Sequence, residues 1–239
     1  MLRRIDDDLW VVDTDFSMGL MEFGGRMTVV RVPDGSLWLH SVIAIDDALA
    51  DALAELGEVK HLVAPNAFHH LFVADAQRRY PDATLYAPRA LGDKRDDLAI
   101  DVVLEGGAPP ESWGGALEMR VMEGAPALDE AVFFHRASKS LVLCDLAFNI
   151  HEGGWLSRLM FRTLGVFGRL KQSPLWRWFT KDRAAAAASL RPMWAWDFER
   201  VILAHGRIVE GPDAKARLAE GMRWMCGHDA PRVLAANAS

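Results

Sequence analysis

The sequence predicts a globular domain in which strands and helices are arranged in layers. Residues 37–86 alternate between strand and helix patterns, which is typical of a layered α/β unit. Residues 100–144 then indicate almost continuous β-structure, interrupted by turns rich in Gly and Pro. The composition, 51% hydrophobic and 25% charged, is that of a globular protein and excludes a disordered or collagen-like chain. With no repeat or linker in the sequence, we expect a single domain over residues 1–239.

The first half of the chain switches between the period of strands and the period of helices. Short apolar runs that end at turn residues predict five strands, at 9–12, 27–32, 37–39, 61–64 and 84–86. Apolar residues spaced by three and four from Ile45 to Leu56 predict a helix that Gly57 ends. A second helical pattern begins after Asn66 and stops near Tyr80.

The second half begins with strands and ends with a helix. The predicted strands are 102–103, 117–121, 131–134, 141–144 and 201–204. The last helix is expected from about Pro212 to Met225.

Residues 155–183 differ from the rest in charge and composition. The segment carries seven bases and one acid, a local charge of +6, whereas the whole chain sums to −6. Three tryptophans and three phenylalanines are interleaved with the bases. Ser173-Pro174 is a good helix start, with Ser as the N-cap and Pro at the first helical position. We therefore expect a basic, aromatic helical insertion at 155–183.

Metal-competent side chains follow three apolar strands at the point where each strand ends. His69 and His70 lie in the loop after residues 61–64, Asp145 ends the strand 141–144, and His205 ends the strand 201–204. Layered sheets place their sites at the carboxyl ends of strands, and imidazole together with carboxylate suits zinc, iron or manganese. If the three strands are neighbours, these four side chains converge on one site.

The order of these elements resembles the metallo-β-lactamase fold superfamily over most of the chain. Leu-Cys-Asp145-Leu is similar to the strand end that supplies that family's metal-bridging aspartate, and Ala-His205-Gly206 is similar to its final histidine ligand. The resemblance implies an α+β fold, a four-layer αββα sandwich of metallo-β-lactamase type. The chain looks most similar to an uncharacterised branch, a domain of unknown function, that keeps the Asn-x-x-His-His, strand-Asp and His-Gly elements.

The family's His-x-His-x-Asp-His loop is degenerate in this chain. Aligned on the strand end, its six positions are residues 66–71, and His70 replaces the aspartate. If the alignment is shifted by one residue, His70 takes the position of the motif's last histidine and His69 the position of its aspartate. In either alignment several ligand positions hold residues that bind no metal, which favours a single ion.

Two further family motifs are absent. The family's Asp-Thr-Gly turn is His40-Ser41-Val42 here. Its Gly-His ligand segment aligns near Pro126, where Asp129 and Glu130 are the nearby polar residues. A site that uses two metal ions is therefore not expected.

The leading functional hypothesis is a metal-dependent hydrolase with a reduced ligand set. His70 and His205, with His69 or Asp145, are expected to hold one divalent ion, with zinc expected before iron or manganese. Asp145 and His70 are the candidate catalytic residues, and His40 and Asn66 are the candidate substrate-binding residues. The substrate is expected to be a small molecule. The competing hypothesis is a binding module that has lost catalysis, supported by the missing ligands.

Each candidate residue also has a purely structural interpretation. His69 and His70 are able to cap the following helix, and Asp145 to cap the turn after its strand. Asn66 is suited to an Asx-turn, and a half-buried His40 to a hydrogen bond with a neighbouring strand. The other histidines are expected to be ordinary: His61, His135, His151 and His228.

Charge and cysteine content indicate the surroundings of the protein. The acidic total, with a pI near 5.7, argues against a nucleic-acid partner. Two cysteines form no disulfide framework and suit a reducing cytoplasm, and residues 1–8 carry no apolar stretch of a secretory signal. The segment 155–183 is the place where a membrane surface or a protein partner is expected, unless its tryptophans cover the site.

Overall fold

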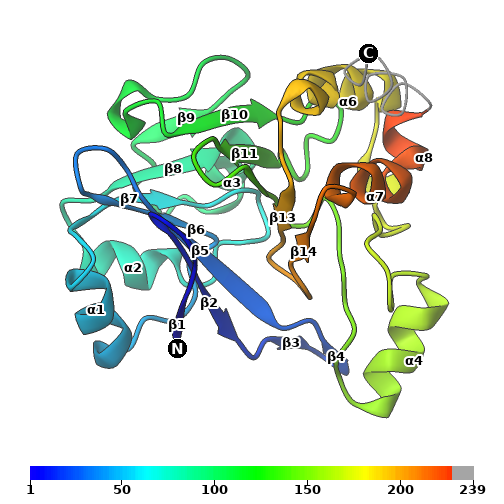
Figure 1. Cartoon of the computed structure of the whole chain (residues 1–239), viewed down its shortest axis with the longest axis horizontal. Helices are drawn as coiled ribbons and strands as arrows, with labels where there is room; N and C mark the ends of the chain where they lie inside the picture. Colours follow the sequence, from blue (N-terminus) through cyan, green and yellow to red (C-terminus); the bar gives the residue numbers. More distant parts are fainter. Residues whose placement is uncertain (228–239) are drawn as a thin grey trace.

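The computed structural model describes residues 1–227, so His228 lies outside the described residues. Two twisted sheets pack face to face in this part of the chain, and helices cover their outer faces (Figure 1). Among residues 1–227, no helix has the length and apolar character that crossing a bilayer requires.

The first sheet has seven strands in the order β1-β2-β5-β6-β7-β8-β9. Their bounds are β1 Leu2–Asp6, β2 Leu9–Thr14, β5 Gly25–Arg31, β6 Leu37–His40, β7 Val59–Val63, β8 Thr84–Pro88 and β9 Val102–Leu104. The pairs from β1 to β6 are antiparallel, and the pairs from β6 to β9 are parallel. Parallel pairing directs the carboxyl ends of β6 and β7 to the same edge of the sheet.

The second sheet has five strands in the order β10-β11-β12-β13-β14. Their bounds are β10 Leu117–Val121, β11 Ala131–His135, β12 Ser140–Val142, β13 Arg200–Ile202 and β14 Val209–Glu210. β12 and β13 pair in parallel, so their carboxyl ends also share an edge. A separate two-stranded hairpin, β3 Ser17–Met18 and β4 Met21–Glu22, projects beside the first sheet (Figure 1).

Side chains alternate between two cores along each strand, as the period of β-structure requires. On β2, Leu9 and Val11 face the second sheet, whereas Val12 packs on the opposite side. Trp38 on β6 and Phe133 on β11 meet edge to face in the core between the sheets, 5.0 Å between ring centroids. The sheets are therefore held together by a continuous apolar layer.

Helices pack on the outer face of each sheet. Against the first sheet lie α1 Asp47–Ala54, α2 Val73–Arg79 and α3 Arg89–Lys94. Against the second sheet lie α5 Trp176–Phe179, α6 Arg183–Leu190, α7 Ala214–Gly221 and α8 Arg223–Cys226. Two short 3-10 helices, Glu111–Trp113 and Arg191–Ala195, complete the elements apart from α4. The four-layer αββα arrangement predicted from the sequence is confirmed.

Several predicted boundaries need correction. The second helix begins at Val73 rather than just after Asn66, because the Asn66 side chain accepts backbone N–H groups and holds residues 66–69 in a turn. The C-terminal helix is divided into α7 and α8. The segment 155–183 is helical only in α4, Trp155–Thr163, and in the short α5.

Gly206 occupies a backbone position that admits no side chain. Its φ of +93° lies in the left-handed region, and a Cβ there meets the carbonyl oxygen of Asn149 at 2.3 Å. Gly206→Ala is expected to lower the free energy of unfolding by roughly 2–4 kcal/mol, as strain and overlap add. Gly168→Ala is the matched control, because Gly168 also has a positive φ but nothing lies within 4 Å. Urea denaturation compares the two, and equal losses would show that the overlap at Gly206 is relieved at no cost.

Candidate metal centre

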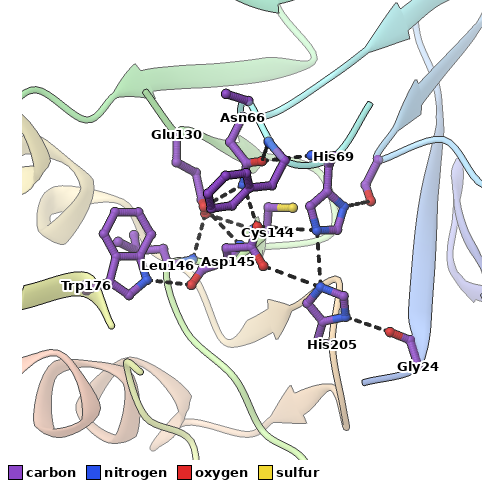
Figure 2. Close-up of polar contacts among 12 residues, drawn as sticks. Gly24, Asn66, His69, Glu130, Cys144, Asp145, Leu146, Trp176 and His205 are labelled. Carbon is purple, nitrogen blue, oxygen red and sulfur yellow. Dashed lines mark hydrogen bonds and ion pairs between the residues drawn. The ribbon is translucent and has the colours of Figure 1, made fainter. Parts of the chain in front are cut away.

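Four strand ends bring polar side chains together at one edge of the sandwich. Ser41 follows β6, His69 lies in the loop after β7, Asp145 follows β12, and His205 follows β13. Figure 2 shows His69, Asp145 and His205 pointing toward one another from these separate loops. The parallel pairing within each sheet produces this convergence.

The three side chains are close enough to share one ion. The Nε2 atoms of His69 and His205 lie 3.1 Å apart. The carboxylate of Asp145 places one oxygen 3.3 Å from His69 Nε2 and the other 3.4 Å from His205 Nε2. Ligand atoms of all three residues lie within 4.8 Å of one another. Two imidazoles and a carboxylate are ligands that divalent zinc, iron or manganese accept.

The second nitrogen of each imidazole is already held by the protein. His205 Nδ1 lies 2.6 Å from the carbonyl oxygen of Gly24, which only accepts, so Nδ1 carries the proton. In the neutral ring, Nε2 of His205 then presents a lone pair to the cluster. His69 Nδ1 is 2.8 Å from Ser41 Oγ, a hydroxyl that either donates or accepts, so this contact orients the ring without fixing its tautomer. Outer partners of this kind orient metal-binding histidines, so the donor set fits a divalent ion.

Burial and charge act in opposite directions on the ionisable groups of the cluster. Burial lowers the pKa of His69, but the neighbouring Asp145 carboxylate outweighs it and leaves the pKa raised. Burial raises the pKa of Asp145, but His69 and His205 together hold that pKa well below its usual range. Asp145 is therefore an anion at neutral pH, as a ligand to a cation must be.

Asn66 uses its whole amide to position the cluster. Its Nδ2 donates to Asp145 Oδ2 at 2.8 Å and to Glu130 Oε2 at 3.1 Å. Its Oδ1 accepts the backbone N–H groups of Phe68 and His69 at 2.9 and 3.0 Å. One side chain thus orients Asp145 and the loop that carries His69.

Glu130 holds the loop that carries Asp145. Its fully buried carboxylate accepts the backbone N–H groups of Cys144, Asp145 and Leu146, at 2.9 to 3.0 Å (Figure 2). Burial and the charge of Asp145 raise the pKa of Glu130 to about 7. Trp176 Nε1 donates to the carbonyl oxygen of Asp145 at 2.7 Å. The backbone on both sides of Asp145 is therefore fixed by buried groups.

A cavity of about 470 Å³ opens onto the cluster. His69, Asp145 and His205 contribute to its wall, and most of its other lining residues are apolar or aromatic. Phe148 lies parallel to the His205 ring at 5.6 Å, and Phe23 tilts against the same ring at 5.6 Å. These rings keep water from the flank of His205 and strengthen electrostatic interactions at the cluster.

Comparisons with known proteins agree with this architecture. Residues 6–92 match the family model described as a domain of unknown function (DUF4336). A metallo-β-lactamase from Pontibacter korlensis is 14% identical, with a TM-score of 0.62 over 92% of this chain and 97% of that one. The DIM-1 metallo-β-lactamase is 13% identical, with a TM-score of 0.60 over 99% and 97% of the two chains. The chain has the metallo-β-lactamase fold.

Other solved structures with this fold are equally distant in sequence. A metal-soaked flavodiiron core from Synechocystis is 12% identical, with a TM-score of 0.63. The match covers 94% of this chain and 60% of the flavodiiron core. No curated protein matches the sequence. Identities this low establish the metallo-β-lactamase fold and leave the activity to be argued from the site.

His70 lies apart from the cluster within this metallo-β-lactamase fold. Its Nδ1 is 2.7 Å from the Arg95 guanidinium, and burial together with Lys94 and Arg95 lowers the pKa of the ring. The predicted metal-ligand and catalytic roles of His70 have no support in this geometry, because its Nδ1 contacts Arg95 and its ring is not part of the group formed by His69, Asp145 and His205. His70 still contributes to the wall of the cavity.

The position of His70 leads to a prediction. His70→Asn is expected to leave divalent-metal affinity unchanged, whereas loss of a true partner of a ligand costs roughly 10–100-fold. Ser41→Ala, which removes the partner of His69 Nδ1, provides that comparison. Isothermal titration of both variants with Zn²⁺ measures the difference. If His70→Asn loses more Zn²⁺ affinity than Ser41→Ala does, His70 is a metal ligand.

His40 and Asn66 occupy positions unlike those of substrate-binding residues. His40 is buried against Trp38 and Phe133, is no part of the cavity wall, and burial lowers its pKa to about 3. Neither ring nitrogen has a hydrogen-bond partner among residues 1–227. Asn66 is also fully buried and spends its amide on the protein, so the Asx-turn interpretation describes it better.

Three residues that position the site were missed by the sequence reasoning. Glu130 was noted only as a polar residue near an absent ligand, although an acid directly before a fully apolar strand is itself a signal of a buried role. Arg26, on β5, donates to the carbonyl oxygens of Leu203 and Gly206 at 2.8 and 2.7 Å, which ties the His205 loop to the first sheet. Ser41 has a positive φ of 57°, a backbone conformation that no sequence pattern predicts.

Proposed function

We propose that the protein is a metal-dependent hydrolase that uses one divalent ion, zinc before iron or manganese. The observation that carries the proposal is the convergence of His69 Nε2, His205 Nε2 and the Asp145 carboxylate, with both Nδ1 atoms held from behind. A divalent ion held there lowers the pKa of a water molecule from 15.7 toward about 7 and so supplies a nucleophile at neutral pH.

The residues of the chain divide the remaining work. His69 and His205 hold the ion through Nε2, and Ser41 and Gly24 keep those nitrogens aimed at it. Among residues 1–227, Asp145 is the only carboxylate in the cavity wall, so one of its oxygens is placed to accept a proton from water. The aromatic wall excludes bulk water from the substrate.

A binding module is the second candidate function, and one observation favours it. The cluster closes on itself, because His69, His205 and Asp145 lie within 3.1 to 3.4 Å of one another and need no ion to be satisfied. In that case the cavity binds a ligand and performs no chemistry.

Metal content and turnover distinguish the two functions. Protein purified without chelator is expected to hold about one equivalent of metal and to cleave p-nitrophenyl esters, with activity lost on chelation and restored by Zn²⁺. Asp145→Asn is expected to lose this activity. Metal uptake without any turnover supports the binding module, and the absence of uptake overturns the hydrolase proposal.

The cellular location of the protein is also a proposal. We propose that the protein is cytoplasmic, since two cysteines in 239 residues are too few for the disulfide framework of a secreted domain. Growth of cells that produce a fluorescent fusion, followed by fractionation, tests the location.

A further inference from the structure

Exposed apolar side chains gather around the mouth of the cavity. Four large hydrophobic residues of the cavity wall are between 42% and 60% exposed: Met18, Phe68, Leu71 and Leu175. Single exposed apolar residues are common, but a group that rims one opening marks a binding site.

The rim is assembled from three separate parts of the chain. Met18 comes from β3, Phe68 and Leu71 from the loop after β7, and Leu175 from the residue before α5. About half of the apolar area of each of these side chains stays in contact with water in the folded protein, and a ligand would remove that area from water. Their position at one opening is therefore best explained by a ligand.

The wall below the rim is also apolar. Phe16, Phe23, Ile43, Phe72 and Phe179 line the same cavity as the rim residues and the proposed metal ligands. A cavity of about 470 Å³ lies within the range of small-molecule sites. Such a wall admits a hydrocarbon chain and places its polar end beside Asp145 and His205.

Basic side chains belong to the cavity and to the segment that lines it: Arg26 and Lys94 are part of the wall, and Lys94 Nζ lies 5.1 Å from the centre of the Phe68 ring. The segment 155–183 contributes Leu175, Trp176 and Phe179 to the cavity, and six of its seven bases are exposed. Trp155, Leu159 and Trp178 of the same segment are 50–80% exposed. Basic and aromatic side chains in combination suit the interface between apolar chains and anionic groups.

We propose that the cavity binds the acyl chain of an amphiphile and that an acyl ester is the substrate class of the site. This inference rests on the proposed hydrolase function. In the reaction, the oxygen of water forms a bond to the acyl carbon and the bond from that carbon to the alcohol oxygen breaks. One proton of the water leaves with the alcohol and the other is released to solvent, so the products are a fatty carboxylate, an alcohol and a proton.

The test measures binding of the product class to the full chain freed of metal. Octanoate, decanoate and dodecanoate are titrated calorimetrically below their micelle concentrations. The Kd is expected to fall by about fourfold for each methylene added. Leu71→Asp and Leu175→Asp are expected to raise the Kd for dodecanoate by about tenfold or more, because a carboxylate at the mouth would lose its hydration to the hydrocarbon chain packed against it.

Val103→Asp is the matched control, since Val103 is equally exposed on β9 and is no part of the cavity wall. It is expected to bind dodecanoate as the wild type does. A Kd independent of chain length, or one retained in both rim variants, would overturn the proposal. The binding measurement is made without metal, so it is independent of hydrolysis. If the Kd depends on chain length but the metal-loaded protein cleaves no dodecanoyl ester, the hydrolase proposal is wrong and the proposed acyl-binding site is retained.

Sedimentation with vesicles identifies the source of the amphiphile. The protein is mixed with vesicles of phosphatidylcholine alone and with vesicles that also contain phosphatidylglycerol. If the protein pellets with the anionic vesicles and the Trp155→Ser variant does not, the acyl chain is taken from a bilayer. Chain-length-dependent binding without pelleting indicates a free amphiphile, and the failure of both binding and pelleting overturns the proposal.

Discussion

His205→Ala is expected to abolish divalent-metal binding while the protein keeps its fold. The substitution removes one of the three proposed ligands, so the loss in affinity should exceed the roughly 10–100-fold that follows loss of an outer partner. Of the three ligands, His205 is the one with its tautomer fixed by a backbone carbonyl, and Nε2 has no other function in the protein than to face His69 and Asp145. Elemental analysis and Zn²⁺ titration measure the effect.

A buried histidine elsewhere in the protein provides the control. His135 is 2% exposed and bonds Ser138 Oγ through Nδ1, at a position outside the cluster. His135→Ala removes the same volume and is expected to retain full metal content. If His205→Ala also keeps its metal, or if both variants lose it together, the ligand set is wrong.

Glu130→Ala is expected to lower the free energy of unfolding by about 3–5 kcal/mol, because it leaves three buried N–H groups without an acceptor. The freed loop is that of Asp145, so metal affinity should fall in the same variant. Glu130→Gln retains the volume and one acceptor oxygen, and an intermediate loss is expected. Urea denaturation and Zn²⁺ titration of the two variants measure both effects.

Glu118 supplies the comparison for stability. It pairs with Arg136 at the surface, and exposed pairs of this kind contribute about 0–1 kcal/mol. A Glu130→Ala loss no larger than that of Glu118→Ala would show that backbone N–H groups of residues 144–146 find another acceptor.

The strands were predictable because the hydrophobic period is a local property of the sequence, whereas the four-layer fold was implied by the resemblance to the metallo-β-lactamase superfamily. The runs at 9–12, 141–144 and 201–204 coincide with β2, β12 and β13, and Asp145 and His205 follow the last two of these strands as expected. Alternation along each strand determines which side chains enter the core between the sheets. Nothing beyond the sequence of each run is needed for that inference.

The assignment of His69 and His70 depended on information that the sequence does not carry. Neighbouring residues in a loop point in directions set by the backbone, and the Asn66 turn directs His69 inward and His70 toward Arg95. The role of Glu130 depends on contacts 14 to 64 residues away in sequence. Residues that act through such long-range hydrogen bonds are found only when the strands are placed.

The cavity also could not be predicted from the sequence. The aromatic segment 155–183 was expected to bind a partner or to cover the site, and it contributes Trp176 and Phe179 to the cavity wall. Phe16 and Phe23, which no periodic pattern singles out, also line the cavity. Three segments far apart in sequence form the rim, so only the fold reveals it.

The central claim is that His69, Asp145 and His205 bind one divalent ion. A crystal of protein soaked in Zn²⁺, measured at the zinc absorption edge, tests the claim directly. We predict one anomalous peak between His69 Nε2, His205 Nε2 and the Asp145 carboxylate, at roughly 2.0–2.2 Å from each ligand atom. A zinc-soaked crystal without a peak there, or with the ion held by His70 instead, would contradict the account.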